Sequence, residues 1–175
     1  MSLLGSQVFA NPTTPCWIPA GSVAYFFAPA SGSFSSTITQ AVAPTTVVPL
    51  VYDTIDIPPV GLTCVTPSAN ITVANAGRYK VLSTIQCDKT TGGSGFLDMW
   101  INVNGTAVPN SATRIEIAQN QELILAVEWF LDLTAGQAIS ISLYSPGTGM
   151  RALAIPAAAP IPAIPSIITT INRIA

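Results

Sequence analysis

The chain has 175 residues, a net charge of −2, and charged residues at only 8 % of its positions, where about 25 % is typical of soluble domains. That length suits one domain with a proper core. The charge balance excludes a basic nucleic-acid-binding face, and without a run of about 18 apolar residues we expect no membrane insertion. So sparse a charge is typical of surfaces that other subunits cover, which predicts a homo-oligomer.

The first 20 residues are predicted to form an extended arm. They contain Pro12, Pro15 and Pro19 and no charge, and their apolar pattern is too weak to fold alone. We expect residues 1–20 to become ordered only against neighbouring subunits or another protein of the same assembly, and residues 21–175 to form a single domain.

The rest of the chain is predicted to be all-β. Proline, glycine, serine and threonine interrupt it too often for helices of ten residues or more, and alternation with period two recurs. The predicted strands are 22–28, 46–55, 70–74, 77–87, 97–103, 112–118, 122–133, 137–145 and 166–174. Short strands at turn-punctuated intervals predict an antiparallel two-sheet jelly-roll sandwich of about ten strands.

Two of these strands show the pattern most clearly. In 97–103, Leu97, Met99, Ile101 and Val103 share one face, and Asp98, Trp100 and Asn102 share the other. The Asn104-Gly105 pair that follows is a strong hairpin signal, since both positions of a type I′ turn need positive φ. In 122–133, the inward face is Leu123, Leu125, Val127, Trp129, Leu131 and Leu133, and the outward face carries Glu122, Glu128 and Asp132.

Two features outside the core pattern are candidates for contacts. A polar apical loop is predicted at Asp88, Lys89, Thr90, Thr91, Gly92, Gly93 and Ser94. It either contacts a ligand or a neighbouring subunit, or is a flexible connection whose glycines allow tight turns. Trp100 lies on the polar face of its strand, which favours an interface anchor over a core role.

The segment 153–165, before the last strand, is a proline-rich ribbon in a stretch of 21 uncharged residues between Arg151 and Arg173. Prolines favour an extended conformation and cannot donate to a central strand. We expect the ribbon to cross the domain along an apolar subunit interface, the alternative being a disordered linker. Its predicted interface residues are Ile155, Pro156, Pro160, Ile161, Pro162, Ile164 and Pro165.

Catalytic chemistry is poorly represented. The chain has no histidine, which removes Ser-His and Cys-His nucleophile arrangements. Cys16, Cys64 and Cys87 are odd in number and widely spaced, so we expect buried free thiols and neither a disulfide nor a zinc site. Four carboxylates could in principle form an acid/base pair: Glu116, Glu122, Glu128 and Asp132. The last three, however, lie on the solvent face of one strand. We therefore expect no enzyme activity and no cofactor.

Several segments, taken in order, resemble the jelly roll of the tumour necrosis factor and complement globular-head superfamily. They are "SVAYFFAPA", "VVPLVYDTIDI" and "ITVANAGRYKVLSTIQ". The segments "DKTTGGSG", "WINVNGTAVPNSATR", "LDLTAGQ" and "LAIPAAAPIPAIPSI" are similar to a subset found in phage tail-fibre and large DNA virus structural proteins. The resemblance implies a ten-strand jelly roll that forms a trimer, with one sheet of each subunit packed round a threefold axis. A collagen-like repeat and the calcium ligands of the complement heads have no counterpart in this sequence.

Together these observations predict a non-enzymatic virion structural protein that assembles in the host cytoplasm and is located in the virion. It would be a capsid, cement (decoration) or short-spike component that self-associates, with the arm 1–20 binding other virion proteins. The alternative is a receptor- or glycan-binding fibre head. That function requires an exposed apical pocket with aromatic residues, and the predicted apical loop has neither Trp nor Tyr.

Overall fold

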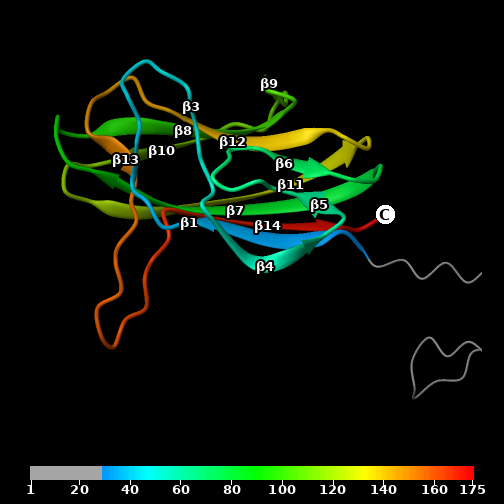
Figure 1. Ribbon diagram of the computed structural model, residues 1–175. Coiled ribbons are helices and arrows are strands. Elements are labelled where there is room, and N and C mark those ends of the chain that lie inside the picture. Colours follow the sequence, from blue (N-terminus) through cyan, green and yellow to red (C-terminus); the bar gives the residue numbers. More distant parts are fainter. Residues whose placement is uncertain (1–28) are drawn as a thin grey trace, which may run out of the picture.

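The computed structural model describes residues 29–175, and within them it has fourteen β-strands and no helix (Figure 1). The strands are β1 (Ser31–Ser36), β2 (Gln40–Ala41), β3 (Val48–Pro49), β4 (Thr54–Val60), β5 (Leu62–Thr63), β6 (Ile71–Val73), β7 (Gly77–Lys89), β8 (Gly95–Val103), β9 (Thr106–Ala107), β10 (Thr113–Ile117), β11 (Glu122–Leu133), β12 (Ala138–Tyr144), β13 (Met150–Ala152) and β14 (Ile167–Arg173). Four strands, β2, β3, β5 and β9, are two residues long, which leaves ten longer ones. The described part of the chain contains no helix that could cross a membrane.

The strands form two antiparallel sheets stacked face to face (Figure 1). Sheet A has the order β2-β13-β7-β14-β1-β4. In addition, every residue of β11 pairs with a residue of β7. Sheet B has the order β10-β8-β12-β6-β5, with β9 beside β8 and β3 beside β12. The prediction of an all-β, two-sheet jelly roll of about ten strands is therefore confirmed.

The core lies between the inner faces of the two sheets. In β8, Leu97, Met99 and Ile101 are fully buried, and in β11 Leu125 and Trp129 are buried, as their alternation predicted. Full burial of a large apolar side chain contributes about 1.5–3 kcal/mol. The turn after β8 has Asn104 at φ 50° and Gly105 at φ 76°, so the predicted hairpin turn is present.

Buried hydroxyl groups join strands of sheet A to the crossing segment before β4. The Tyr52 hydroxyl and Thr169 Oγ1 are 2.8 Å apart, and Ser83 Oγ lies 2.8 Å from the same Thr169 oxygen. All three side chains are buried, and burial raises the pKa of Tyr52 well above its ordinary value. Buried polar groups are costly without partners, so this chain of hydrogen bonds favours one pairing register.

The predicted strand 46–55 is wrong as a single element. It is divided into β3, an isolated bridge between Tyr52 and Ser68, and the start of β4. The chain here crosses from sheet B, where β3 pairs with β12, to sheet A, where β4 pairs with β1. Its N–H groups bond to scattered acceptors, such as Leu50 N–H to the Ile141 carbonyl (2.8 Å), so one continuous ladder cannot form.

Two predicted segments lie outside the described residues: the arm 1–20 and the strand 22–28. The first described strand in the chain is β1, with the sequence SGSFSS, and it lies between β14 and β4 in sheet A. Sequence reasoning did not predict this strand.

Candidate interaction surfaces

The apical end of the domain, where β7 passes into β8, is formed by loops 90–94, 118–121 and 145–149. Thr90 N–H donates to the Gly149 carbonyl (2.9 Å), and Gly93 N–H donates to Gln119 Oε1 (3.2 Å). Gly149 has φ +78°, and a Cβ there would lie 2.6 Å from Thr91 Oγ1. The loop 90–94 is therefore held against its neighbours rather than being an unsupported connection.

Asp88 and Lys89 were predicted in this loop, and the structure corrects that prediction. They are the last residues of β7 and are buried. Asp88 forms an ion pair with Arg151 of β13, and Lys89 Nζ donates to the Thr148 carbonyl (2.5 Å). The strand extends this far because β13 pairs with it, Met150 opposite Lys89. Asp88 and Lys89 therefore stabilise the apical end through buried contacts and are not exposed on its surface.

The ribbon 153–165 turns back on itself, so the expectation that it crosses the domain is wrong. Ile155 and Ile164 exchange two backbone hydrogen bonds of 2.9 Å each, and Ala158 and Ile161 exchange bonds of 3.0 and 2.7 Å. All four donors are non-proline residues, and Pro156, Pro160 and Pro162 fall between them. The lack of a proline N–H therefore does not prevent a hairpin. We call residues 153–165 the Pro/Ala hairpin.

The base of the Pro/Ala hairpin is fixed to the body and its tip projects. Leu153 N–H donates to the Gln86 carbonyl (2.8 Å), and Ala154 N–H donates to Thr39 Oγ1 (3.0 Å). In Figure 1 the hairpin, drawn in orange, extends away from sheet B on the side of sheet A. Near the tip, Ile161 is 60 % exposed. Of the other predicted interface residues, Pro156, Pro160 and Pro162 are exposed, and Ile155, Ile164 and Pro165 are partly buried.

The outer face of sheet A, turned away from the core, carries exposed apolar side chains. Four of them are Leu82 (38 % exposed), Ile124 (67 %), Phe130 (59 %) and Ile168 (40 %). In the register of the sheet, Thr84 lies between Ala126 of β11 and Ile168 of β14, and Leu82 is opposite Thr170. The centre of this face therefore contains apolar and small side chains together with Glu128, which lies opposite Leu82 on β11.

Two ion pairs on this face join neighbouring strands. Lys80 Nζ lies 2.7 Å from Glu128 Oε2, and Arg78 Nε lies 2.8 Å from Asp132 Oδ1. The hydrogen bonds from Arg78 hold the pKa of Asp132 below its ordinary value. Two carboxylates considered for acid/base chemistry are thus partners of cations.

Sequence reasoning described the outward side of 122–133 only by its acids. Ile124, Ala126 and Phe130 have the same parity as Glu122 and Glu128, so the signal for an apolar outer face was present. Its extension to β7 and β14 depends on strand pairing, which the alternation alone does not give.

Trp100 lies on the other sheet. It is half-buried on the outer face of sheet B, and its Nε1–H donates to Asn102 Oδ1 (2.9 Å), while Asn102 Nδ2 donates to Ser142 Oγ (2.8 Å). The structure therefore separates Trp100 from the Pro/Ala hairpin, which joins β13 and β14 of sheet A.

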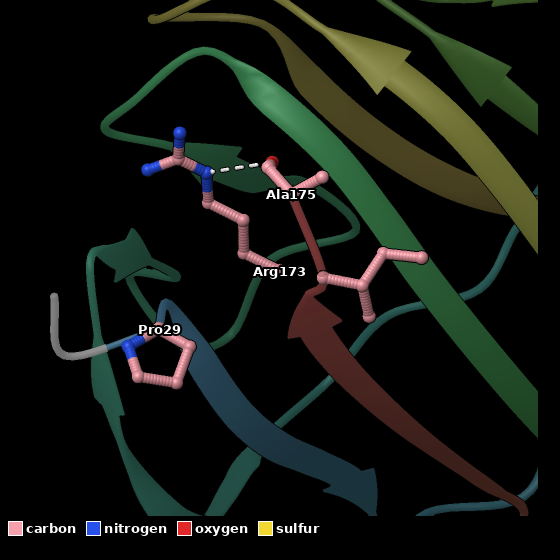
Figure 2. A pocket seen from close by; sticks show the side chains of 4 residues that line it. Pro29, Arg173 and Ala175 are labelled. Atoms are coloured by element: carbon pink, nitrogen blue, oxygen red, sulfur yellow. Dashed lines mark hydrogen bonds between the residues drawn. The ribbon is translucent and has the colours of Figure 1, made fainter.

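A cavity of about 420 Å³ lies beside the C-terminal residues, lined in the described chain by Pro29, Arg173, Ile174 and Ala175 (Figure 2). Arg173 Nε donates to the Ala175 carbonyl at 3.1 Å.

Comparison with known proteins supports the fold. No protein-family profile matches the chain, and no curated protein is similar to it in sequence. Among solved structures, the globular domain of zebrafish complement 1qA protein superposes with a TM-score of 0.52 at 9 % identity, covering 83 % of this chain and 98 % of that one. The chain thus has the jelly-roll fold of the complement globular heads, as the sequence resemblance implied, and at 9 % identity the similarity concerns the fold alone.

Proposed function

We propose that this protein is a virion structural protein that assembles as a homotrimer through the outer face of sheet A. The observation that carries the proposal is the apolar centre of that face, where Leu82 and Ile168 are exposed although the inner face of the sheet already forms the core. Apolar side chains gain by leaving water, and a second copy of the chain presents the same exposed apolar side chains.

The charges of the molecule fit close approach of identical surfaces. Four ion pairs join described residues, and these pairs use eight of the fourteen charged residues of the chain. Two of the pairs, Lys80 with Glu128 and Arg78 with Asp132, are on the outer face of sheet A. A neighbouring copy would therefore meet two pairs of charges that are already neutralised, which lowers the cost of covering them.

The number of subunits and the virion location rest on the sequence resemblance. In the superfamily that it indicates, one sheet of each jelly roll packs round a threefold axis, and the subset containing similar "WINVNGTAVPNSATR" and "LAIPAAAPIPAIPSI" segments consists of phage and large DNA virus structural proteins. A receptor- or glycan-binding fibre head would need aromatic residues at the apical end, and loops 90–94 and 145–149 contain none.

Sedimentation velocity at micromolar concentration tests the assembly. We expect the wild type to sediment with the mass of three chains and the double variant Leu82→Glu/Ile168→Glu to sediment as a monomer with an unchanged far-ultraviolet spectrum. The control is Val65→Glu, which places one glutamate at an exposed apolar residue between β5 and β6 and should remain trimeric. A double variant that keeps the wild-type mass would show that this face is not the interface.

A separate measurement tests the location. Mass spectrometry of purified particles of the virus that encodes the chain should detect it in a fixed ratio to the main capsid protein. Its absence from the particles would contradict the virion role while leaving the trimer intact.

A further inference from the structure

The Pro/Ala hairpin (residues 153–165) is a second apolar feature that the fold leaves uncovered. It contains no charged residue, and the exposed residues Pro156, Pro160, Ile161 and Pro162 lie beyond the Ile155–Ile164 pair. Its arms are joined to each other by backbone hydrogen bonds between Ile155 and Ile164 and between Ala158 and Ile161, so the hairpin is already folded before any partner is bound.

We infer that the Pro/Ala hairpin is a clasp that lies on the outer face of sheet A of a second copy of this chain. This inference rests on the proposed assembly through that face and adds the segment that fastens it. The hairpin joins β13 to β14, both strands of sheet A, and extends on the side of that sheet away from sheet B (Figure 1). It therefore projects toward the side on which a neighbouring subunit would dock.

The dimensions of the hairpin suit this role. Each arm has about six residues, which at about 3.3 Å per residue gives a reach of about 20 Å. Adjacent strands lie about 4.8 Å apart, so the reach corresponds to about four strands of a neighbouring sheet. That width includes the β11, β7 and β14 strands that carry Ile124, Leu82 and Ile168.

The base of the hairpin is fixed to the body of the domain by hydrogen bonds at both of its ends. Leu153 bonds to Gln86 of β7, Ala154 bonds to Thr39, and Ser166 N–H donates to the Ser36 carbonyl of β1 at 2.9 Å. Preorganised segments lose little conformational entropy when they bind. Proline adds to this because its φ is fixed.

A second copy of the chain fits the hairpin better than a membrane does. Segments that insert at a lipid interface typically carry Trp or Phe together with Lys or Arg, and residues 153–165 contain none of these. The small apolar side chains suit packing on a surface of Leu82, Thr84, Ala126 and Ile168, where the neighbouring Glu128 is paired with Lys80.

Site-specific photocrosslinking tests the clasp. Two full-length chains with different affinity tags are co-expressed, and only the first carries p-benzoylphenylalanine at position 161 in place of Ile161. We expect a crosslink between the two tags, mapped by mass spectrometry to β7, β11 or β14 of the second chain. The matched control places the same group at Thr106, an exposed residue after the β8 hairpin turn, and should give no crosslink between tags. Crosslinks confined to one chain, or to other strands of the second chain, would overturn the clasp.

A shortened variant separates the clasp from the assembly itself. Because Ile155 and Ile164 are a bonded pair, residues 156–163 can be replaced by Asn-Gly, a two-residue turn that suits such a pair. The shortened trimer should dissociate at a concentration about tenfold higher than the wild type, which for three subunits is about a hundredfold change in the dissociation constant, or about 2.7 kcal/mol. If it dissociates at the wild-type concentration while Leu82→Glu/Ile168→Glu is monomeric, the clasp is wrong and the proposed assembly stands.

Vesicle flotation tests whether the Pro/Ala hairpin binds a lipid membrane. Wild-type protein that floats with vesicles of phosphatidylcholine and phosphatidylserine, while the shortened variant does not, would assign the hairpin to lipid and overturn the clasp. We expect neither protein to float.

Discussion

The contact between the apical loops can be tested by adding one methyl group. Gly149 has φ +78°, and a Cβ at this position would lie 2.6 Å from Thr91 Oγ1, 2.7 Å from Thr91 N and 3.0 Å from Thr91 O. Two of these atoms belong to the backbone, so the neighbouring loop has to move as a unit. Gly149→Ala therefore combines an unfavourable backbone conformation with a steric clash.

The expected magnitude follows from these two effects. A non-glycine residue in the left-handed region costs about 1–2 kcal/mol, and overpacking a close contact costs about 1–3 kcal/mol. Gly149→Ala should therefore lower the free energy of unfolding by about 2–5 kcal/mol. Gly136→Ala is the matched control, because Gly136 has φ +84° and nothing lies within 4 Å of its added Cβ. It should cost only the conformational part, about 1–2 kcal/mol.

Equilibrium urea unfolding of both variants measures the difference. Both must be compared with the wild type at one protein concentration, since the stability of an oligomer depends on concentration. Equal destabilisation by the two substitutions would refute the reasoning, because it would mean that loop 145–149 does not contact loop 90–94 in solution.

Two further predictions concern ionisable groups. Burial raises the pKa of the Cys87 thiol to about 12, so iodoacetamide at pH 8 should leave Cys87 unmodified in the folded protein and modify it after unfolding; modification of the folded protein, detected by mass spectrometry, would contradict its burial. For Asp53, partial burial raises the pKa, but the hydrogen bonds from Thr37 and Thr54 outweigh it and leave the pKa lowered. The stabilisation from Asp53 is therefore complete above the unfolded pKa of about 3.9 and is lost as pH falls through the lower folded value. Asp53→Asn should thus destabilise the protein to urea at pH 7 but not at a pH below that folded value, and an effect independent of pH would contradict this reasoning.

Elements whose signal comes from residues close together in the sequence were predicted correctly. The bounds of β11, Glu122–Leu133, were predicted because alternation of apolar and polar side chains is a property of residues two apart. The turn at Asn104 and Gly105 was predicted because positive φ at both positions is a preference of those two residue types. The same local signals were enough to assign the all-β class.

The candidate surfaces were predictable only in part. The exposed apolar residues of the Pro/Ala hairpin were recognised from their sequence, but its return at Ala159 and Pro160 was not, because the bonds that close it join Ile155 to Ile164. Prolines predict an extended backbone equally well for a crossing ribbon and for the arms of a hairpin. Only the pairing partners distinguish the two.

Tertiary structure alone decided the position of β1. Its sequence, SGSFSS, has one large apolar residue, and a serine-rich segment reads locally as a loop. It is nevertheless a buried strand of sheet A because β14 and β4 pair with its two edges, and Asp56 Oδ1 accepts a hydrogen bond from Ser35 Oγ at 2.8 Å. Burial of a polar side chain becomes favourable only when such a partner is present, and here the partner is 21 residues away in the chain. The sequence by itself therefore determined which segments alternate and where they turn, whereas long-range hydrogen bonding decided which polar segment entered the sheet.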